Sequence, residues 1–442
     1  MSNEQSNQEQ LDRSLGPLMI WGLGVGYVIS GEYFGWNLGL AEGGPYGFML
    51  AMALVTLMYV CFTLSYAELA CALPKAGGAF VYGHRAFGRE IGFLVGWAQI
   101  LEFVFAPPAI AFAIGAYLNT YFPTTSPLWF SVGAYGLFTL LNMWGVKHSA
   151  LFELVITIFA VIELLIFTGV TLPHFSIEHF TQDPLPNGWA GSFAALPFAI
   201  WFYLAIEGVA NLAEEAKDPQ RQISRGFIYA MATLVFLAIC VFVSSVGVAG
   251  WKAIVYDPQT QQPSDSPLPL AIALVVGNHH LFYHLLVTIG LFGLVASFHG
   301  ILLVAGRALF EFGRVGYLPR RIGQTHPTRK TPHFALAVNG VIGLIALFLG
   351  HTGDMITLAV FGALFLYIVS MLSLLKLRRS EPELNRPYKT PLYPLLPYCA
   401  LGIALLCMGS MYIFHLKIGL FFTALMGGAW GVYKVILAPK FD

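Results

Sequence analysis

The sequence predicts an all-α membrane protein with twelve transmembrane helices. Of its 442 residues, 57% are hydrophobic and only 10% are charged, whereas a soluble domain is about 25% charged. Apolar stretches of about 20 residues, the length that crosses a bilayer as a helix, recur along the whole chain. We place these stretches at residues 16–41, 46–71, 90–121, 127–145, 150–172, 190–214, 225–250, 280–312, 334–350, 354–377, 392–414 and 416–437.

The distribution of Lys and Arg favours this number of spans. With the N-terminus in the cytoplasm and alternating spans, 21 of the 23 Lys and Arg residues fall on the cytoplasmic side. Only Lys252 and Lys417 fall outside. Because cytoplasmic loops hold the excess of positive charge, we expect a multi-pass protein of the bacterial cytoplasmic (inner) membrane with both termini in the cytoplasm.

The spans divide the chain into four segments. Residues 1–14 are polar and are predicted to be a disordered cytoplasmic N-terminus. Residues 15–377 form the core with the first ten helices, and residues 378–391 form a charged cytoplasmic linker. Residues 392–442 hold the last two helices and the C-terminus.

Composition argues against several classes of function. The net charge of zero gives no support for a nucleic-acid partner. The five cysteines have no metal-binding or redox spacing, and we expect neither a metal nor a cofactor. The oligomeric state is left open.

Two of the predicted spans are interrupted, and each interruption carries an acid. The first lies in the glycine-rich run Gly22–Trp36 and contains Glu32, and the second lies in Trp201–Gly208 and contains Glu207. A carboxylate in a membrane span is costly unless it faces a cavity, a partner or a ligand. Interrupted spans at matching depths, five spans apart, are typical of carriers with a five-plus-five inverted repeat, here followed by two extra helices. The acids predict a substrate with positive charge.

Several linked motifs resemble one transporter family. They are Tyr66–Ala70, Pro74–Tyr82, Phe87-Gly88, Gly96-Trp97, Gly145–Ala150, Glu207-Gly208, Glu214–Arg221 and Ser297–Arg307. In these motifs the chain resembles the amino acid–polyamine–organocation (APC) transporters over roughly residues 15–400. The resemblance implies an APC/LeuT-type fold with broken helices 1 and 6 and transport by alternating access.

Within that family, the run Ser30–Asn37 is most similar to the bacterial ethanolamine permeases. Amino acid carriers of the family usually have Gly-Ser-Gly here, and its free N–H groups hold the substrate carboxylate. In this chain Ile29 replaces the first Gly and Glu32 follows the second. A β-branched residue is poorly suited to unwinding, and a carboxylate beside Glu32 would be repelled. We therefore expect import of a small primary amine cation, with ethanolamine as the favoured substrate.

The resemblance and the breaks together indicate a set of candidate substrate-binding residues. They are Ser30, Gly31, Glu32, Tyr33, Glu102, Trp201, Phe202, Tyr203, Ala205, Glu207, Ser297 and His299. Glu32 either binds the ammonium or caps the second half-helix. Glu207 has either a gating or a substrate role, and Glu102 is either an amine ligand or a protonated packing residue. The aromatic residues can form a cation–π cage, whereas His299 is either a titrating or a core histidine.

The driving force is open between uniport along the membrane potential and coupling to protons or sodium. Some proton-coupled relatives carry a Lys in the fifth span, and Ala160 stands at that position here. Glu153 and Glu163 in the same span are weaker candidates for the site.

Two other functions compete with amine import. An amino acid permease of the same family would make Glu32 merely structural. A membrane-embedded enzyme would need a nucleophile or metal motif, and no His-x-x-x-His, His-Glu-x-x-His or Gly-x-Ser-x-Gly run occurs. We therefore expect a carrier rather than an enzyme.

Overall fold

The structure is a computed structural model that describes residues 15–75, 77–144, 149–329 and 331–441. The predicted disordered segment 1–14 lies outside the described residues, as do Lys147 and Lys330 of the predicted cytoplasmic loops. Within the described ranges the chain is helical, and its extended pairings are two isolated β-bridges. This agrees with a chain that must bond its own backbone groups inside a bilayer.

Ten helices form the long elements of the bundle. They are α3 (Leu38–Ala72), α5 (Arg89–Asn119), α6 (Pro127–Trp144), α7 (Ser149–Thr171), α11 (Pro219–Ala249), α14 (Leu281–Val315), α15 (His333–Leu349), α16 (Thr352–Ser380), α17 (Leu395–Phe414) and α18 (Leu416–Val432). Shorter helices complete the described chain. They are α1 (Pro17–Val28), α2 (Ser30–Tyr33), α4 (Ala79–Phe87), η1 (Leu172–His174), α8 (Ile177–Phe180), α9 (Ala190–Ala194), α10 (Leu196–Trp201), η2 (Ile206–Leu212), α12 (Lys252–Val255), α13 (Pro267–Val276), η3 (Tyr433–Leu437) and α19 (Ala438–Phe441).

Helices occupy every one of the twelve predicted stretches. Among the described residues, eight helical segments are long and apolar enough to cross a membrane, and the first and sixth stretches are built from shorter pieces. The boundary between the first two predicted stretches falls at a kink in α3, where Gly44 has a φ of 61° and Pro45 follows it. Crossing of the bilayer by all twelve stays a prediction.

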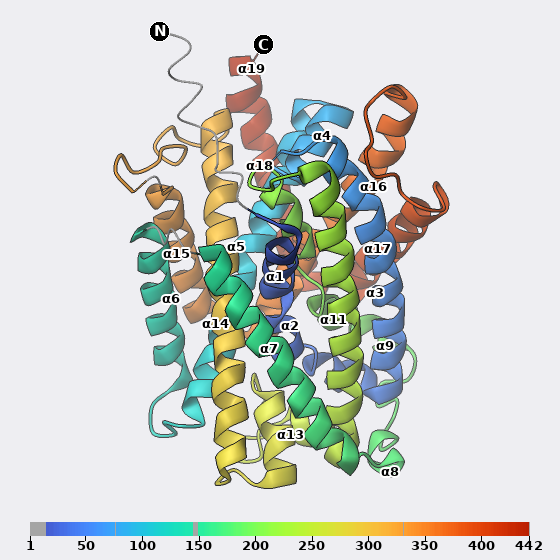
Figure 1. Cartoon of the computed structure of the whole chain (residues 1–442), viewed down its shortest axis with the longest axis vertical. Helices are drawn as coiled ribbons and strands as arrows, with labels where there is room; N and C mark the ends of the chain where they lie inside the picture. The colour runs from blue at the N-terminus through green and yellow to red at the C-terminus, as the bar shows by residue number, and fades with distance from the viewer. Residues whose placement is uncertain (1–14, 76, 145–148, 330, 442) are drawn as a thin grey trace.

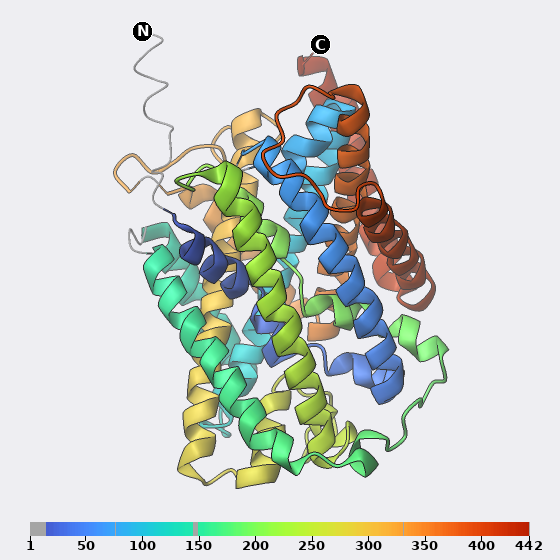
Figure 2. The ribbon, with the colours of Figure 1, turned by 45° about the vertical axis from the view of Figure 1, so that its right-hand side comes forward.

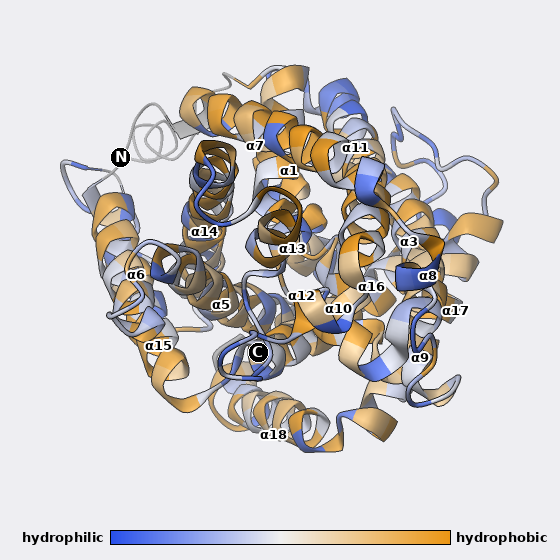
Figure 3. Cartoon of the chain, turned by 90° about the horizontal axis from the view of Figure 1, so that it is seen from below, coloured by the Kyte–Doolittle hydropathy of each residue, from blue (hydrophilic) through white to orange (hydrophobic). Residues whose placement is uncertain are grey.

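The short first helix lies in the middle of the bundle. In Figure 1, α1 and α2 lie behind α7 and are flanked by α11 and α14. The last two long helices lie outside this group, where α17 packs on α3 and α16 and α18 packs on α16 and α5 (Figure 2). Large apolar side chains such as Phe152, Leu420 and Phe348 are exposed on the outer helices, and Figure 3 shows hydrophobic residues around the rim. A continuous apolar rim suits contact with lipid.

Side-chain contacts sort the loops into two ends. At one end, which we call the basic end, three ion pairs join α4, α14 and η3 to their neighbours: Arg85–Glu381 at 2.9 Å, Arg307–Glu215 at 2.9 Å and Lys434–Glu90 at 2.7 Å. At the opposite end Lys252 pairs with Asp183 at 2.8 Å, and the Asn37 amide donates to the Ser264 carbonyl at 2.8 Å. Each ion pair joins residues that the alternating topology places on one side of the membrane. The basic end is uppermost in Figure 1, and α8 and α13 are lowest.

Candidate functional site

The first break lies at the C-terminal end of the glycine-rich run, later than Ser30 and Gly31. Ile29 joins α1 to α2 in a right-handed helical conformation, with φ −57° and ψ −22°. The chain leaves the helix only at Phe34, which is extended, and at Gly35, whose φ is 87°. The side chain of a β-branched residue at position 29 favours a regular backbone over an unwound one. Helix α1 thus ends at Val28, the short helix α2 follows from Ser30, and the non-helical backbone begins at Phe34.

Glu32 sits in the last turn before this break. The structure places Glu32 in the first turn of the four-residue helix α2, after the interruption at Ile29, so its role at a helix N-terminus stays a prediction beside its role in the site. The Glu32 side chain is fully buried, and neither of its carboxylate oxygens has a hydrogen-bond partner among the described residues. A buried carboxylate without a partner is costly. The surroundings favour a cation.

The break is held open by fixed hydrogen bonds. The Gly35 N–H donates to the Asn37 side-chain oxygen at 3.0 Å, and the Asn37 amide reaches Ser264 across the chain. The Trp36 indole N–H donates to the Glu32 carbonyl at 3.2 Å. These bonds satisfy backbone and side-chain groups that unwinding would leave unpaired.

The second break is centred on Ala205. Helix α10 ends at Trp201, and the chain resumes as the 3₁₀ helix η2 at Ile206. Ala205 has a left-handed φ of 75°, a conformation that costs a non-glycine residue free energy and persists only where its surroundings hold it. The left-handed residue therefore lies within the predicted run Trp201–Gly208, and Gly208 itself lies inside η2.

The two breaks touch each other directly. A methyl group at Gly31 would overlap the carbonyl oxygen of Trp201, so only glycine permits this approach. Around the contact, the Phe34 ring meets the Trp201 ring edge-on at 5.4 Å, and the Trp36 ring stacks on Phe202 at 5.7 Å. The candidates from the two breaks thus form one cluster. The indole N–H of Trp201 has no partner within the described structure.

A second cluster of acids joins α5, η2 and α16. The Tyr367 hydroxyl donates to the Glu207 carboxylate at 2.8 Å and lies 3.0 Å from the Tyr59 hydroxyl. The carboxyl of Glu102 lies beside that of Glu207, and the Ala205 N–H approaches it outside full hydrogen-bond geometry. Two buried carboxylates in contact repel each other, so sharing one proton stabilises the pair.

Two tyrosine candidates have their hydroxyl groups engaged by the protein. The Tyr33 hydroxyl donates to Glu163 at 2.7 Å, and its ring packs against Gly293 of α14. The Tyr203 hydroxyl lies 2.8 Å from the Thr56 hydroxyl, and its ring remains within electrostatic range of Glu32. Tyr33 therefore packs between helices, and Tyr203 is buried near Glu32 with its ring 5.2 Å from that of Tyr59.

The two candidates on α14 face different neighbours. Ser297 donates to the Tyr27 carbonyl at 2.9 Å and to the Ser30 hydroxyl at 2.8 Å, so it contacts the first broken helix. His299 lies two residues later, about 200° around a helix, and faces Glu153 of α7 at 4.0 Å. The structure therefore separates His299 from the cluster at the breaks.

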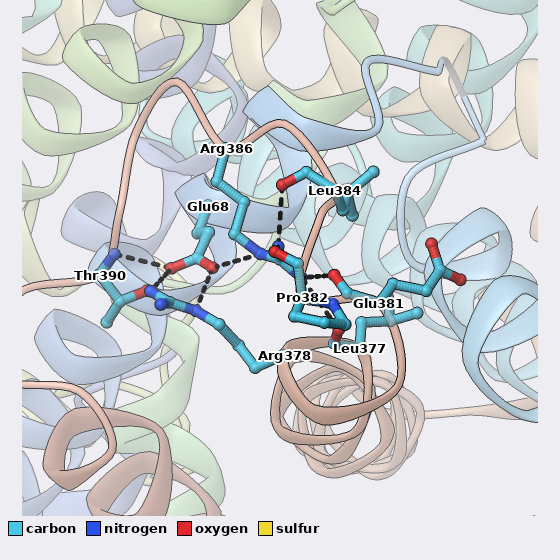
Figure 4. Close-up of polar contacts among 8 residues, drawn as sticks. All are labelled: Glu68, Leu377, Arg378, Glu381, Pro382, Leu384, Arg386 and Thr390. Carbon is cyan, nitrogen blue, oxygen red and sulfur yellow. Dashed lines mark hydrogen bonds and ion pairs between the residues drawn. The ribbon is translucent and has the colours of Figure 1, made fainter.

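The basic end holds a carboxylate with a full set of partners (Figure 4). Glu68 of α3 accepts from the Arg378 Nε and Nη2 atoms at 2.6 and 2.7 Å and lies 3.2 Å from the Arg386 Nε. It also accepts from the Thr390 backbone N–H at 2.7 Å. We call Glu68 and these three partners the Glu68 clamp. It fixes the linker onto α3 and α16.

A cleft opens near the basic end between η2, α5 and α14. It is lined by Gln99, Asn211, Arg307 and Glu311, and its empty space, open mouth included, is about 330 Å³. In the described residues, no group of three His, Cys, Asp or Glu side chains is placed to hold a metal ion.

Sequence reasoning missed Thr56, Tyr59 and Tyr367, which complete the polar network around the breaks. With 20 tyrosines in an apolar chain, no local pattern distinguishes the two that bond to the site. It also missed the pairing of Glu68, because its partners lie more than 300 residues away along the chain.

Comparison with known proteins identifies the family. A family model described as amino acid permease matches residues 15–427. The chain belongs to the amino acid permease family. This permease is 29% identical to a transporter of Rhizobium meliloti (strain 1021), over 94% of this chain and 90% of that protein. It is 24% identical to the branched-chain amino acid permease BcaP of Bacillus subtilis (strain 168), over 91% of this chain and 88% of BcaP.

Another relative is named for an amine. The permease is 25% identical to the low-affinity putrescine importer PlaP of Escherichia coli (strain K12), over 86% of this chain and 83% of PlaP. The family and the names of these relatives show that the permease is a multi-pass membrane transporter of the APC family and not an enzyme.

Proposed function

We propose that this permease imports a small primary amine cation, with ethanolamine as its substrate, across the bacterial cytoplasmic membrane. The observation that carries the proposal is the Glu32 carboxylate, which is fully buried and has no hydrogen-bond partner among the described residues. An isolated buried carboxylate costs several kcal/mol or more. An ammonium group bound beside it would supply the missing countercharge and hydrogen-bond donors.

The backbone around Glu32 disfavours a substrate carboxylate. The Ile29 N–H is bonded to the Val25 carbonyl at 2.8 Å, and the Glu32 N–H is bonded to the Ile29 carbonyl at 3.0 Å. These two N–H groups are therefore not free for the carboxylate of an amino acid. The charge of Glu32 repels a second anion.

Aromatic side chains give the same region a surface for cations. Tyr203 lies within electrostatic range of Glu32, and Trp201 stands in the wall of the same break. Each ring face contributes about 0.5–2 kcal/mol to binding an ammonium. In our proposal the free Trp201 indole N–H donates to the hydroxyl oxygen of ethanolamine.

The proposed cycle uses the broken helices as gates. Amine enters from the end opposite the basic end, which we place outside the cell, and binds beside Glu32. Helices α2 and α10 close over it through the Gly31–Trp201 contact, and the bundle then opens toward the cytoplasm at the basic end. Twelve spans, a five-plus-five repeat and cytoplasmic termini belong to this proposal. Glu102 and Glu207 act as gating residues that join α5, η2 and α16 during this movement.

An amino acid substrate is the second candidate. The names of BcaP and of the glutamate/serine transporter AimA, which is 27% identical over 86% of this chain, favour it. In that case the carboxylate would need donors other than the bonded N–H groups of Ile29 and Glu32.

Uptake into proteoliposomes tests the proposal. Purified permease should accumulate labelled ethanolamine, and an excess of unlabelled leucine or glutamate should leave this uptake unchanged. Glu32→Gln should lower ethanolamine uptake at least about tenfold, equivalent to about 1.4 kcal/mol. Glu178→Gln, which removes an exposed acid in a loop, is the matched control and should transport like the wild type.

Two results would contradict the proposal. Leucine uptake without ethanolamine uptake would establish the amino acid alternative. Normal ethanolamine uptake by Glu32→Gln, with equal protein in the liposomes, would remove Glu32 from the site.

A further inference from the structure

A buried carboxylate and imidazole lie together outside the cluster at the breaks. Glu153 of α7 and His299 of α14 have their Oε2 and Nδ1 atoms 4.0 Å apart, and both side chains are buried. Glu153 Oε1 and His299 Nδ1 have no hydrogen-bond partner within the described structure. The amine site proposed above uses neither residue.

Glycines of two helices make room for the Glu153 carboxylate. A methyl group at Gly26 of α1 would lie 3.1 Å from Glu153 Oε1, and one at Gly300 of α14 would lie 3.3 Å away. One turn along α7, the Thr157 hydroxyl donates to the Gly22 carbonyl of α1 at 3.1 Å. Helix α7 therefore meets the first broken helix through a carboxyl and a hydroxyl group.

Few other titratable groups face the pair. From α1, Tyr27 lies within electrostatic range of Glu153, Arg307 and Glu215, and Arg307 and Glu215 are paired with each other at 2.9 Å. From α6, Phe138 meets the His299 ring edge-on, and Asn142 donates to the His299 carbonyl. Helix α13, which also packs on α7, carries no titratable side chain, and in the described residues no titratable side chain of α11 pairs with Glu153 or His299. Among the described residues, His299 is the ion-pair partner of Glu153.

The chemistry of the pair is that of a proton carrier. With a neutral imidazole and an ionised carboxylate, the buried charge is uncompensated, which is costly. One added proton yields either an imidazolium–carboxylate ion pair or a neutral acid beside a neutral imidazole, and a hydrogen bond then joins the two. The proton arrives from water on one side and leaves to water on the other, so no other bond is made or broken.

We propose that Glu153 and His299 form a proton-binding site that is separate from the substrate site and coupled to movement of α1. The coupling follows from shared elements, because α1 carries both Gly26, against Glu153, and Tyr27, whose carbonyl accepts from Ser297. Ser297 in turn contacts Ser30 next to the amine site. A displacement of α1 would therefore change the surroundings of the proton and the amine together. The coupling to amine rests on the proposed function, whereas the proton site does not.

Two measurements test this site, and the first needs no substrate. Infrared difference spectra between high and low pH detect the carbonyl stretch of carboxyl groups that take up protons. The wild-type spectrum should contain a component that Glu153→Gln lacks and that Glu178→Gln, in an exposed loop, retains. His299→Gln should shift the pH at which this component appears. An unchanged spectrum in Glu153→Gln would overturn the proposal.

The second measurement is transport of labelled ethanolamine into proteoliposomes. With the voltage clamped at zero, an inward proton gradient should drive accumulation by the wild type and not by Glu153→Gln. Exchange of internal for external ethanolamine should survive in Glu153→Gln within about threefold, since less than 0.7 kcal/mol is then lost. Gradient-driven accumulation by Glu153→Gln at the wild-type level would overturn the proposal.

The outcomes separate the two proposals. If the wild type does not transport ethanolamine, amine import fails, and the infrared result alone decides the proton site. If Glu153→Gln is not recovered as folded protein, His299→Gln takes its place in both measurements, with loss of gradient-driven accumulation expected and its retention contradicting the site.

Discussion

Glu68 and Glu32 are equally buried carboxylates in opposite surroundings. Both side chains have a relative exposure of 0%. Glu68 meets two guanidinium groups and a backbone N–H, whereas the oxygens of Glu32 meet no donor in the described structure. A buried charge without a partner destabilises a fold, so a partner from outside the chain is the simplest reason to keep one. The comparison teaches that missing partners, rather than burial, mark the candidate site.

The largest expected effect on stability is at Glu68, the buried carboxylate that has partners. Glu68→Gln leaves the Arg378 and Arg386 guanidinium groups facing each other without their countercharge, and the Arg386 side chain is only 5% exposed. Removing one partner of a buried pair costs about 3–5 kcal/mol, so the thermal unfolding temperature in detergent should fall sharply. Arg85→Gln, which breaks an exposed pair with Glu381, is the control and should not change it. An unchanged unfolding temperature in Glu68→Gln would show that the Glu68 clamp does not stabilise the fold.

A smaller loss is expected where the two breaks meet. Gly31→Ala places a methyl group against the Trp201 carbonyl and forces α2 and α10 apart, at a cost of about 1–3 kcal/mol. The melting temperature and ethanolamine uptake should both fall. Gly136→Ala adds a methyl group in open space on α6 and should be tolerated. Normal uptake by Gly31→Ala would mean that the breaks need not touch during transport.

Asp265 is intermediate between Glu68 and Glu32, because its carboxylate has a single hydroxyl partner. It accepts from Thr352 at 2.8 Å, and burial raises the pKa of this carboxyl from its ordinary 3.8 to about 6, against the lowering effects of Thr352 and His351. The folded state therefore holds the proton more tightly, so the stabilisation is full below about pH 4 and is lost as pH rises through about 6. Because Asp265 is partly exposed, we expect this stabilisation of the folded state to be about 1–2 kcal/mol.

Asp265→Asn should abolish this part of the pH dependence. Melting temperatures at pH 4, 5, 6 and 7 should fall more steeply for the wild type than for the variant. Parallel curves would contradict the raised pKa.

The smallest effect on stability is expected for Glu32→Gln. Because the Glu32 oxygens have no donor to lose, removing the charge should change the free energy of unfolding by less than about 1 kcal/mol or raise it. Thermal unfolding of the substrate-free permease measures this. A loss of several kcal/mol would place Glu32 with Glu68 as a structural acid.

The sequence was sufficient for the helices and for the existence of two breaks. Apolar length places helices in all twelve predicted stretches, because a bilayer demands long apolar segments. Glu32, Trp201 and Tyr203 were found as neighbours because the breaks in two distant spans were expected to meet, and the Gly31–Trp201 contact brings those breaks together.

The details of the site depend on contacts that no local pattern records. The break at Phe34 instead of Ser30 reflects the hydrogen bonds of Asn37 to Gly35 and Ser264, and the latter lies 227 residues away. The left-handed Ala205 is equally hidden, since alanine usually favours a regular helix. His299 was assigned to the substrate site from its span alone, whereas its neighbour Glu153 decides where it belongs.

The Glu68 clamp has a practical consequence for imaging. It joins one end of α3, the end of α16 and residues 381–390 into a single stiff patch, while α1 contacts its neighbours through small residues such as Gly26. We expect an antibody fragment raised against this patch to bind away from α1. It would add mass for electron cryomicroscopy without arresting transport, and so provide a fixed reference against which displacement of α1 can be measured.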